Sequence, residues 1–180
     1  MAAPHAMYIA RGIADFLNRQ RCTLDVRYLE LSAQAALEAL VRGEVQLAVV
    51  RYQSIYEEYY KSVFAQSGLA WRVLMQYKAV VLMAQNHPLA SKEHLTPQQL
   101  ADYPQLVEGD IQLPVDLCGK VLKEEQMPGN SRIYVQDRAS QMILLKDLRG
   151  SYMWSQGLSP AELSHRHLVQ RPCNGGNNKD

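Results

Sequence analysis

Apolar and polar side chains recur along the first part of the chain with two different periods. Residues 24–31 alternate apolar with polar side chains and then turn apolar, and residues 45–50 form a short apolar run, which predicts two strands. Residues 33–42 between them predict a helix, with Ser32 as its N-cap and Gly43 where a positive φ is needed. A strand, a helix and a strand in this order require a parallel sheet with a right-handed crossover.

The same periods predict further elements on both sides of this α/β unit. Residues 7–18 place apolar side chains on one helical face, so they predict an amphipathic helix. Pro4 disfavours much strand pairing in residues 1–6 before it. The later elements are expected to be helices at 52–64, 98–103, 115–125 and 139–148, two strand-like runs within 69–83, and strands at 106–107, 132–135 and 151–154.

Two segments of the chain carry a resemblance to a known family. Residues 80–110, VVLMAQNHPLASKEHLTPQQLADYPQLVEGD, contain a hydrophobic strand, an HPLA tetrapeptide, a Leu-Thr-x-x-x-Leu helix and a second strand in that order. Residues 23–50, TLDVRYLELSAQAALEALVRGEVQLAVV, end in a pattern similar to L-x-x-G-x-x-D-L-A-I, with Gln46 where the family usually has Asp. Over roughly its first two thirds the chain resembles the effector-binding domain of LysR-type transcriptional regulators.

The resemblance implies an α/β fold with two lobes, similar to type II periplasmic binding proteins. Each lobe would be a mainly parallel sheet flanked by helices, with a ligand cleft between the lobes. We expect residues 1–79, with 168–180, to form the first lobe and residues 80–167 the second, with chain crossings near 78–81 and 167–171. The family also has a strand before the first helix and a strand and helix after the last crossing, so truncated termini are expected here. The family's DNA-binding winged helix-turn-helix is expected to be absent from this chain.

Composition narrows the classes of function. The 180 residues carry a net charge of +1, with basic residues scattered among acidic ones, so no nucleic-acid footprint is expected. No apolar run is long enough to cross a membrane, and no signal peptide is recognisable. Cys22, Cys118 and Cys173 lack metal-ligand spacing, so a reducing, cytoplasmic location is expected and no metal site. Nucleotide-binding, hydrolase and zinc-protease motifs are missing, so neither enzyme activity nor a cofactor is expected.

Candidate effector-binding residues follow from where ligands bind in open α/β sheets, which is in the loops after the carboxyl ends of the strands. Ser32 would offer its hydroxyl and the amides of a helix N-terminus to a carboxylate, and Arg51 would offer a guanidinium after a buried strand. The alternatives are a plain helix cap for Ser32, a solvated or lobe-bridging arginine for Arg51, a surface residue for His5 and a core residue for Trp154. The candidates are His5, Ser32, Arg51, Asp110, Gln112, Arg138 and Trp154.

The predicted function is effector sensing in a bacterial regulator of transcription. A small, anionic organic effector would bind one arrangement of the lobes better than another, since otherwise no signal would result. The expected partners are this effector, further copies of the chain in a homodimer or tetramer formed through residues 7–18, and DNA only through a separate N-terminal domain. No membrane partner is expected. Two alternatives stay open, a solute receptor for transport and an enzyme on the same fold. The missing signal peptide counts against the solute receptor, and the missing acid/base pair counts against the enzyme.

Overall fold

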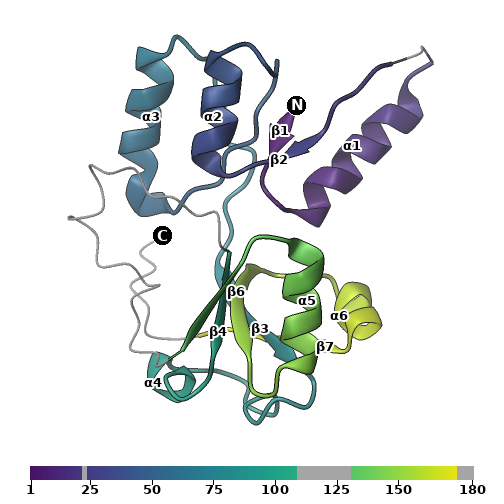
Figure 1. Ribbon diagram of the computed structural model, residues 1–180, viewed down its shortest axis with the longest axis vertical. Coiled ribbons are helices and arrows are strands. Elements are labelled where there is room, and N and C mark those ends of the chain that lie inside the picture. Colours follow the sequence, from purple (N-terminus) through teal and green to yellow (C-terminus); the bar gives the residue numbers. More distant parts are fainter. Residues whose placement is uncertain (22–23, 109–130, 174–180) are drawn as a thin grey trace. The chain divides into compact units, whose positions relative to one another are not determined.

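The computed structural model describes residues 1–21, 24–108 and 131–173, and it divides the chain into two compact units (Figure 1). Among the described residues the first unit is Met1–Arg72, and the second begins at Val73. Both units contain helices and strands, which confirms the α/β class. None of the described helices is long and apolar enough to span a membrane.

The first unit is built on a small parallel sheet. β1 pairs in parallel with β2, with Ala3 opposite Glu30, and Ala2 also bridges in parallel to Ala48. β1 therefore lies between β2 and the 45–50 segment, which forms only the bridge at Ala48 and not the predicted strand. The predicted parallel arrangement of the two segments is confirmed, and β1 ends before Pro4. The elements are β1 (Ala2–Ala3), α1 (Met7–Arg19), β2 (Leu29–Glu30), α2 (Ala33–Val41), the 3-10 turn η1 (Ser54–Tyr56) and α3 (Glu57–Gln66).

Small side chains allow α2 to pack closely on this sheet. Ala36 and Ala39 of α2 are buried against Ala2 and Val45. Val45 is the largest buried residue of this cluster, and the other three are alanines. The ends of α2 are as predicted, since Ser32 caps it and Gly43 has a φ of 72°. The two predicted strands are much shorter than expected, because, within the described part of the chain, residues 24–28 and most of 45–50 pair with no further strand.

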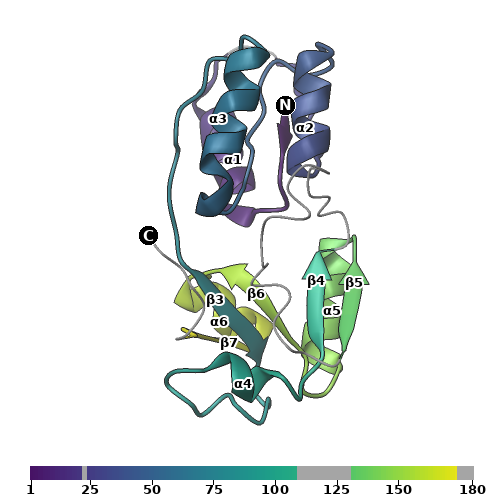
Figure 2. The ribbon, with the colours of Figure 1, turned by 90° about the vertical axis from the view of Figure 1, so that its left-hand side faces the viewer.

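The second unit is built on a five-stranded sheet in the order β5-β4-β6-β3-β7. β5, β4 and β6 are parallel, whereas β3 is antiparallel to both β6 and β7, so β3 alone among these described strands runs in the opposite direction. α5 packs against β3, β4 and β5 (Figure 2). The elements are β3 (Ala79–Ala84), α4 (Pro97–Leu100), β4 (Gln105–Glu108), β5 (Arg132–Val135), α5 (Arg138–Asp147), β6 (Tyr152–Gln156), α6 (Pro160–Arg166) and β7 (Leu168–Arg171).

Two apolar clusters cover the two faces of this sheet. Successive side chains of a strand point to opposite faces, and Val81 and Met83 lie in one cluster while Leu82 lies in the other. All three are fully buried, which explains why β3 reads as a continuous apolar run. The first cluster comprises Val81, Met83, Leu95, Leu100 and Tyr152, and the second comprises Leu82, Leu106, Leu145, Met153 and Leu168.

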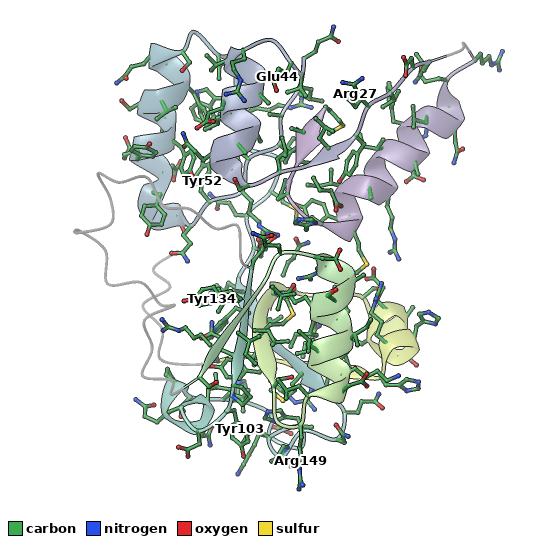
Figure 3. All side chains as sticks on the ribbon, in the orientation of Figure 1. Arg27, Glu44, Tyr52, Tyr103, Tyr134 and Arg149 are labelled. Carbon is green, nitrogen blue, oxygen red and sulfur yellow. The ribbon has the colours of Figure 1, made fainter. Side chains whose placement is uncertain are left out.

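The histidine of the HPLA tetrapeptide joins three turns of the second unit. His87 is 5% exposed, and its Nδ1 accepts the backbone N–H of Leu89 at 3.0 Å. Its Nε2 must then carry the proton and donate to the carbonyl of Gly150 at 2.9 Å. The ring also packs on Tyr103, with centroids 4.7 Å apart, and Figure 3 shows Tyr103 and Arg149 at the same end of the unit. Burial lowers the pKa of His87, so the neutral ring is the form that this arrangement stabilises.

Several boundaries differ from the expected ones. The first unit ends at Arg72 rather than at residue 79. The expected return of 168–180 to the first lobe does not apply to β7, because β7 hydrogen-bonds to β3 and buries Leu168 in the second unit's core. The α6 helix was not expected. It begins with a capping box in which Ser159 and Glu162 bond each other's backbone amides. The predicted helix at 115–125 lies outside the described residues.

Candidate functional site

The carboxyl edge of the first unit's sheet brings together loops that are far apart in sequence. Because β1, β2 and the 45–50 segment are parallel, His5, Ser32 and Arg51 all follow a strand at this edge. The Ser32 hydroxyl accepts the N–H of Ala35 at 3.3 Å, so its role as a helix cap is confirmed. A capping hydroxyl still has its own proton to donate, and no hydrogen bond to the amide of Ala33 occurs among the described residues.

His5 is held in place by a carboxylate at the same edge. Its Nδ1 lies 2.7 Å from Oε2 of Glu30, and the side chains of the two residues are 15% and 43% exposed. His5 is therefore neither a loose surface residue nor an isolated ligand contact. Glu30 was not among the predicted residues, although its place at the end of a predicted strand is the signal that could have found it. It brings a hydrogen-bond acceptor next to the helix N-terminus at Ser32.

In the second unit Gln141 and Ser155 are among the groups that contact the side chain of Arg138. Its Nη1 donates to Oε1 of Gln141 at 2.6 Å, and its Nη2 lies 3.5 Å from Oγ of Ser155. Arg138 is the first residue of α5, and Ser155 is the penultimate residue of β6. Both therefore lie at the carboxyl edge of the parallel strands β5, β4 and β6. Asp137 caps α5, since its Oδ2 accepts the N–H of Ser140 at 2.7 Å.

The remaining candidates are not placed with Arg138. Trp154 is partly buried and packs on the cluster that contains Val81 and Tyr152, which agrees with the core alternative. Its neighbour Ser155 points to the opposite face of β6, toward Arg138. Asp110 and Gln112 lie outside the described residues. No group of three or more potential metal ligands occurs within the described ranges.

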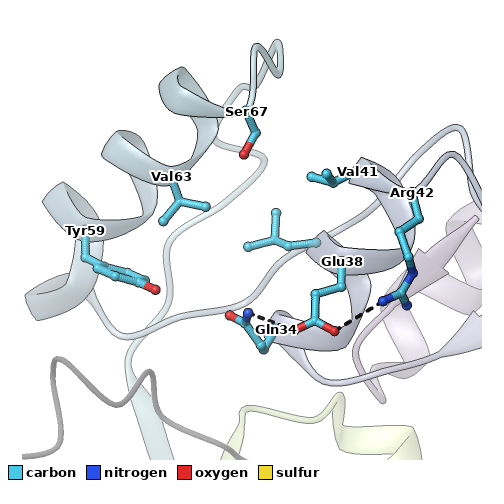
Figure 4. Close-up of a pocket in the computed structure, with 8 residues that line it drawn as sticks. Gln34, Glu38, Val41, Arg42, Tyr59, Val63 and Ser67 are labelled. Atoms are coloured by element: carbon cyan, nitrogen blue, oxygen red, sulfur yellow. Dashed lines mark hydrogen bonds and ion pairs between the residues drawn. The ribbon is translucent and has the colours of Figure 1, made fainter.

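A groove of about 240 Å³ lies between α2 and α3 (Figure 4). Leu37 and Val63 give it an apolar floor. Two contacts within α2 link polar residues at its rim. Oε1 of Glu38 accepts a hydrogen bond from Nε2 of Gln34 at 3.0 Å, and Oε2 of Glu38 lies 3.6 Å from Nη1 of Arg42. The residues that line it are Gln34, Leu37, Glu38, Val41, Arg42, Tyr59, Val63 and Ser67, and none of them is a predicted site residue.

Comparison with known proteins identifies what the chain is similar to. The family model described as the LysR substrate binding domain matches residues 2–145. The structure is similar to the effector-binding domain of QuiR in complex with shikimate, at 16% identity and a TM-score of 0.65, over 96% of this chain and 78% of that one.

Two further solved structures are similar over nearly the same part of this chain. The oxidised form of OxyR matches at 15% identity and a TM-score of 0.65, over 97% of this chain and 78% of that one. The regulatory domain of a cysteine-to-serine variant of MetR, a LysR family regulator from N. meningitidis, matches at 16% identity and a TM-score of 0.53, over 97% and 78%. Among curated protein sequences none matches. At these identities the structural likeness concerns the fold, a two-lobed α/β domain of the type II periplasmic-binding-protein kind.

Proposed function

We propose that this chain, which belongs to the family of LysR substrate-binding domains, senses a small organic anion through the strand-end loops that carry Ser32 and Arg138. Ligand sensing for the regulation of transcription follows from the family, and it does not favour the transport alternative. The family is not an enzyme family. The class of the ligand and the residues that hold it are the parts that we propose.

The observation that carries the proposal is the oriented guanidinium of Arg138. A guanidinium offers five N–H donors in a planar fork that matches a carboxylate. Gln141 and Ser155 contact Nη1 and Nη2 of this fork and limit its orientation. A guanidinium that is already oriented loses less side-chain entropy when it binds an anion.

The α2 N-terminus supports the same class of ligand. Its cap, Ser32, is neutral, so the positive end of the helix dipole is not cancelled by the cap itself. A carboxylate there would accept from the Ser32 hydroxyl and from nearby backbone amides. His5 and Arg51 in the first unit remain proposed contacts, as do Asp110 and Gln112, which lie outside the described residues. The effector-binding domain of QuiR is described with shikimate, a hydroxylated ring carboxylate, which belongs to the proposed class.

The signal would pass through an oligomer. LysR regulators act as oligomers and typically carry a separate DNA-binding domain, and we propose a homodimer or tetramer for this chain. Phe16 on α1 is 54% exposed, and Ile13 and Leu17 on the same helix are only partly buried, so α1 offers an apolar surface for such contacts. The isolated chain is proposed not to bind DNA.

A thermal-shift screen with small carboxylates, shikimate among them, tests the proposal. The wild type should be stabilised by at least one of them. Ser32→Ala and Arg138→Ala should each lower its affinity by about 1–3 kcal/mol, because each removes a hydrogen bond to a charged group. Arg51→Ala tests the third candidate.

Lys146→Gln is the matched control, because Lys146 is exposed in the last turn of α5 and its replacement also removes one positive charge. This variant should respond like the wild type. If carboxylates bind and Ser32→Ala, Arg51→Ala and Arg138→Ala all respond like the wild type, the site lies elsewhere. If only neutral or cationic compounds stabilise the chain, the anion class is wrong.

A further inference from the structure

Gln141 is a polar side chain in an unusually buried position. Only 2% of it is exposed, and it lies in the first turn of α5. Burying a carboxamide is unfavourable unless hydrogen bonds replace those it made with water. Its Oε1 accepts from Nη1 of Arg138 at 2.6 Å, across the three-residue spacing that places two side chains on one helix face. A buried acceptor therefore has a short bond to the guanidinium of the proposed site.

This bond limits the rotamers of Arg138. Ser155 engages the other terminal nitrogen at a longer distance of 3.5 Å, so the shorter contact to Gln141 is the stronger of the two. Gln141 has little freedom of its own, since its neighbours on the same helix include the fully buried Leu145. The guanidinium is thus attached to a fixed point of the core and not to another mobile surface side chain.

We propose that Gln141 is the positioning residue of the effector site and that its neutral amide makes the second unit selective for an anion. Through its Oε1 it limits the orientations that the Arg138 guanidinium takes at the carboxyl edge of the sheet. A carboxylate at this position would keep the hydrogen bond and add a full negative charge beside the guanidinium. The inference rests on the proposed function, because it concerns the same Arg138.

Two substitutions separate the hydrogen bond from the charge. Gln141→Glu keeps the shape and the acceptor and adds the negative charge. Gln141→Met keeps the volume and removes the acceptor. We expect both variants to bind shikimate and inorganic phosphate about five- to tenfold more weakly than the wild type, at constant ionic strength. Lys146→Gln, which removes a charge elsewhere on α5, should bind both probes like the wild type.

Two readouts distinguish positioning from a merely structural role. The NMR signals of the Arg138 guanidinium should stay sharp in Gln141→Glu and broaden in Gln141→Met, because only the second variant releases the group. In an Arg138→Lys background, Gln141→Met should cause no further loss of affinity, since no guanidinium remains to be oriented. An equal further loss in that background would overturn the inference.

The outcomes also separate this inference from the proposed function. If the wild type binds neither phosphate nor any carboxylate of the screen, shikimate included, both are overturned. If the wild type binds and Arg138→Ala loses binding, but both Gln141 variants bind like the wild type, the proposed function stands and the role of Gln141 is wrong. If Gln141→Met is unfolded by circular dichroism, the Gln141→Glu result alone decides, since unchanged anion affinity in that variant contradicts the selectivity claim.

Discussion

The sheets of the two units differ in the length of their strands and in how many of their faces are covered. In the first unit β1 and β2 have two residues each, and the core beside them consists of alanines and Val45. In the second unit the described strands have four to six residues, and apolar clusters cover both faces of the sheet. Since stabilisation by burial grows with the apolar area removed from water, the second unit has the larger core contribution.

The two units also differ in how far the apolar side chains of their strand segments are exposed to solvent. Leu24 and Val26, on the outer side of β2's segment, are each 44% exposed, and Leu47 beside the Ala48 bridge is 57% exposed. By contrast Val81, Leu82 and Met83 of β3 are fully buried, because β6 and β7 flank β3 and helices cover the sheet. The same apolar strand pattern thus forms a long strand only where neighbouring strands pair with it.

The largest effect is expected from Leu82→Ala. Leu82 is fully buried between Leu106, Leu145, Met153 and Leu168, so the variant should lose about 2–5 kcal/mol of unfolding free energy through lost burial and the cavity left behind. Urea unfolding followed by Trp154 fluorescence in a Trp71→Phe background reports on the second unit. Leu37→Ala, which empties a position of the first unit, should leave this transition in place, because the two cores share no residue. Equal shifts for both variants would show that the units unfold as one.

Two glycines with similar backbone angles should respond differently to alanine. Gly150 has a φ of 75°, and a Cβ there would lie 3.0 Å from Cδ1 of Tyr103, so Gly150→Ala should cost about 1–3 kcal/mol. Gly43 has a φ of 72° with nothing within 4 Å of a Cβ, so Gly43→Ala should cost only the backbone strain of about 1 kcal/mol. Thermal unfolding measures both. Equal losses would contradict the tight packing of Tyr103 around this turn.

Acid should weaken the second unit through His87. Burial lowers the pKa of His87 in the folded chain, whereas the unfolded histidine takes up a proton near its ordinary value of about 6.5. The unfolded state therefore binds more protons, so the contribution is fully present above about pH 6.5 and is lost as the pH falls through the folded pKa. Urea titrations at several pH values should show this loss in the wild type and a flatter profile in His87→Asn. His165→Asn, at an exposed position, is the control, and an unchanged slope in His87→Asn would contradict the account.

The smallest effect is expected at the end of α6. His167 is in the left-handed region, with a φ of 56°, at a position where helices commonly have glycine. His167→Gly should remove this strain and raise the unfolding free energy by about 0.5–1 kcal/mol, with the gain partly offset by the greater freedom of glycine when unfolded. Differential scanning calorimetry at pH 7.5 should show a higher midpoint. A lower midpoint would mean that the imidazole contributes more than the backbone strain costs.

The sequence predicted the parts of the fold that local chemistry determines. Ser32 caps the N-terminus of α2 and Gly43 follows its C-terminus, as their residue types predict, and β3 follows its apolar run. The α6 helix was missed although Ser159, Pro160 and Glu162 form a readable capping box. These residues alone could therefore have predicted the start of α6.

Other features depend on packing that one sequence does not display. Nothing in the helical pattern of α5 shows that Gln141 is buried, because its burial depends on how α5 packs against β3, β4 and β5. The pairing of His5 with Glu30 depends on the parallel register of β1 and β2. The short strands of the first unit depend on neighbours that a local pattern cannot reveal. Trp154 fits either a cleft wall or a core residue until its side of β6 is known.

The most direct test of the proposed anion site is an amide NMR titration of the 180-residue chain with the carboxylate that gives the largest thermal shift. We predict saturable shift changes at the amides of Ala33 and Ser32 in the first unit and of Arg138 and Gln141 in the second, with the same dissociation constant at both places. Changes confined to the groove between α2 and α3, at Glu38, Val41 and Val63, would place the ligand elsewhere. That result would contradict the account.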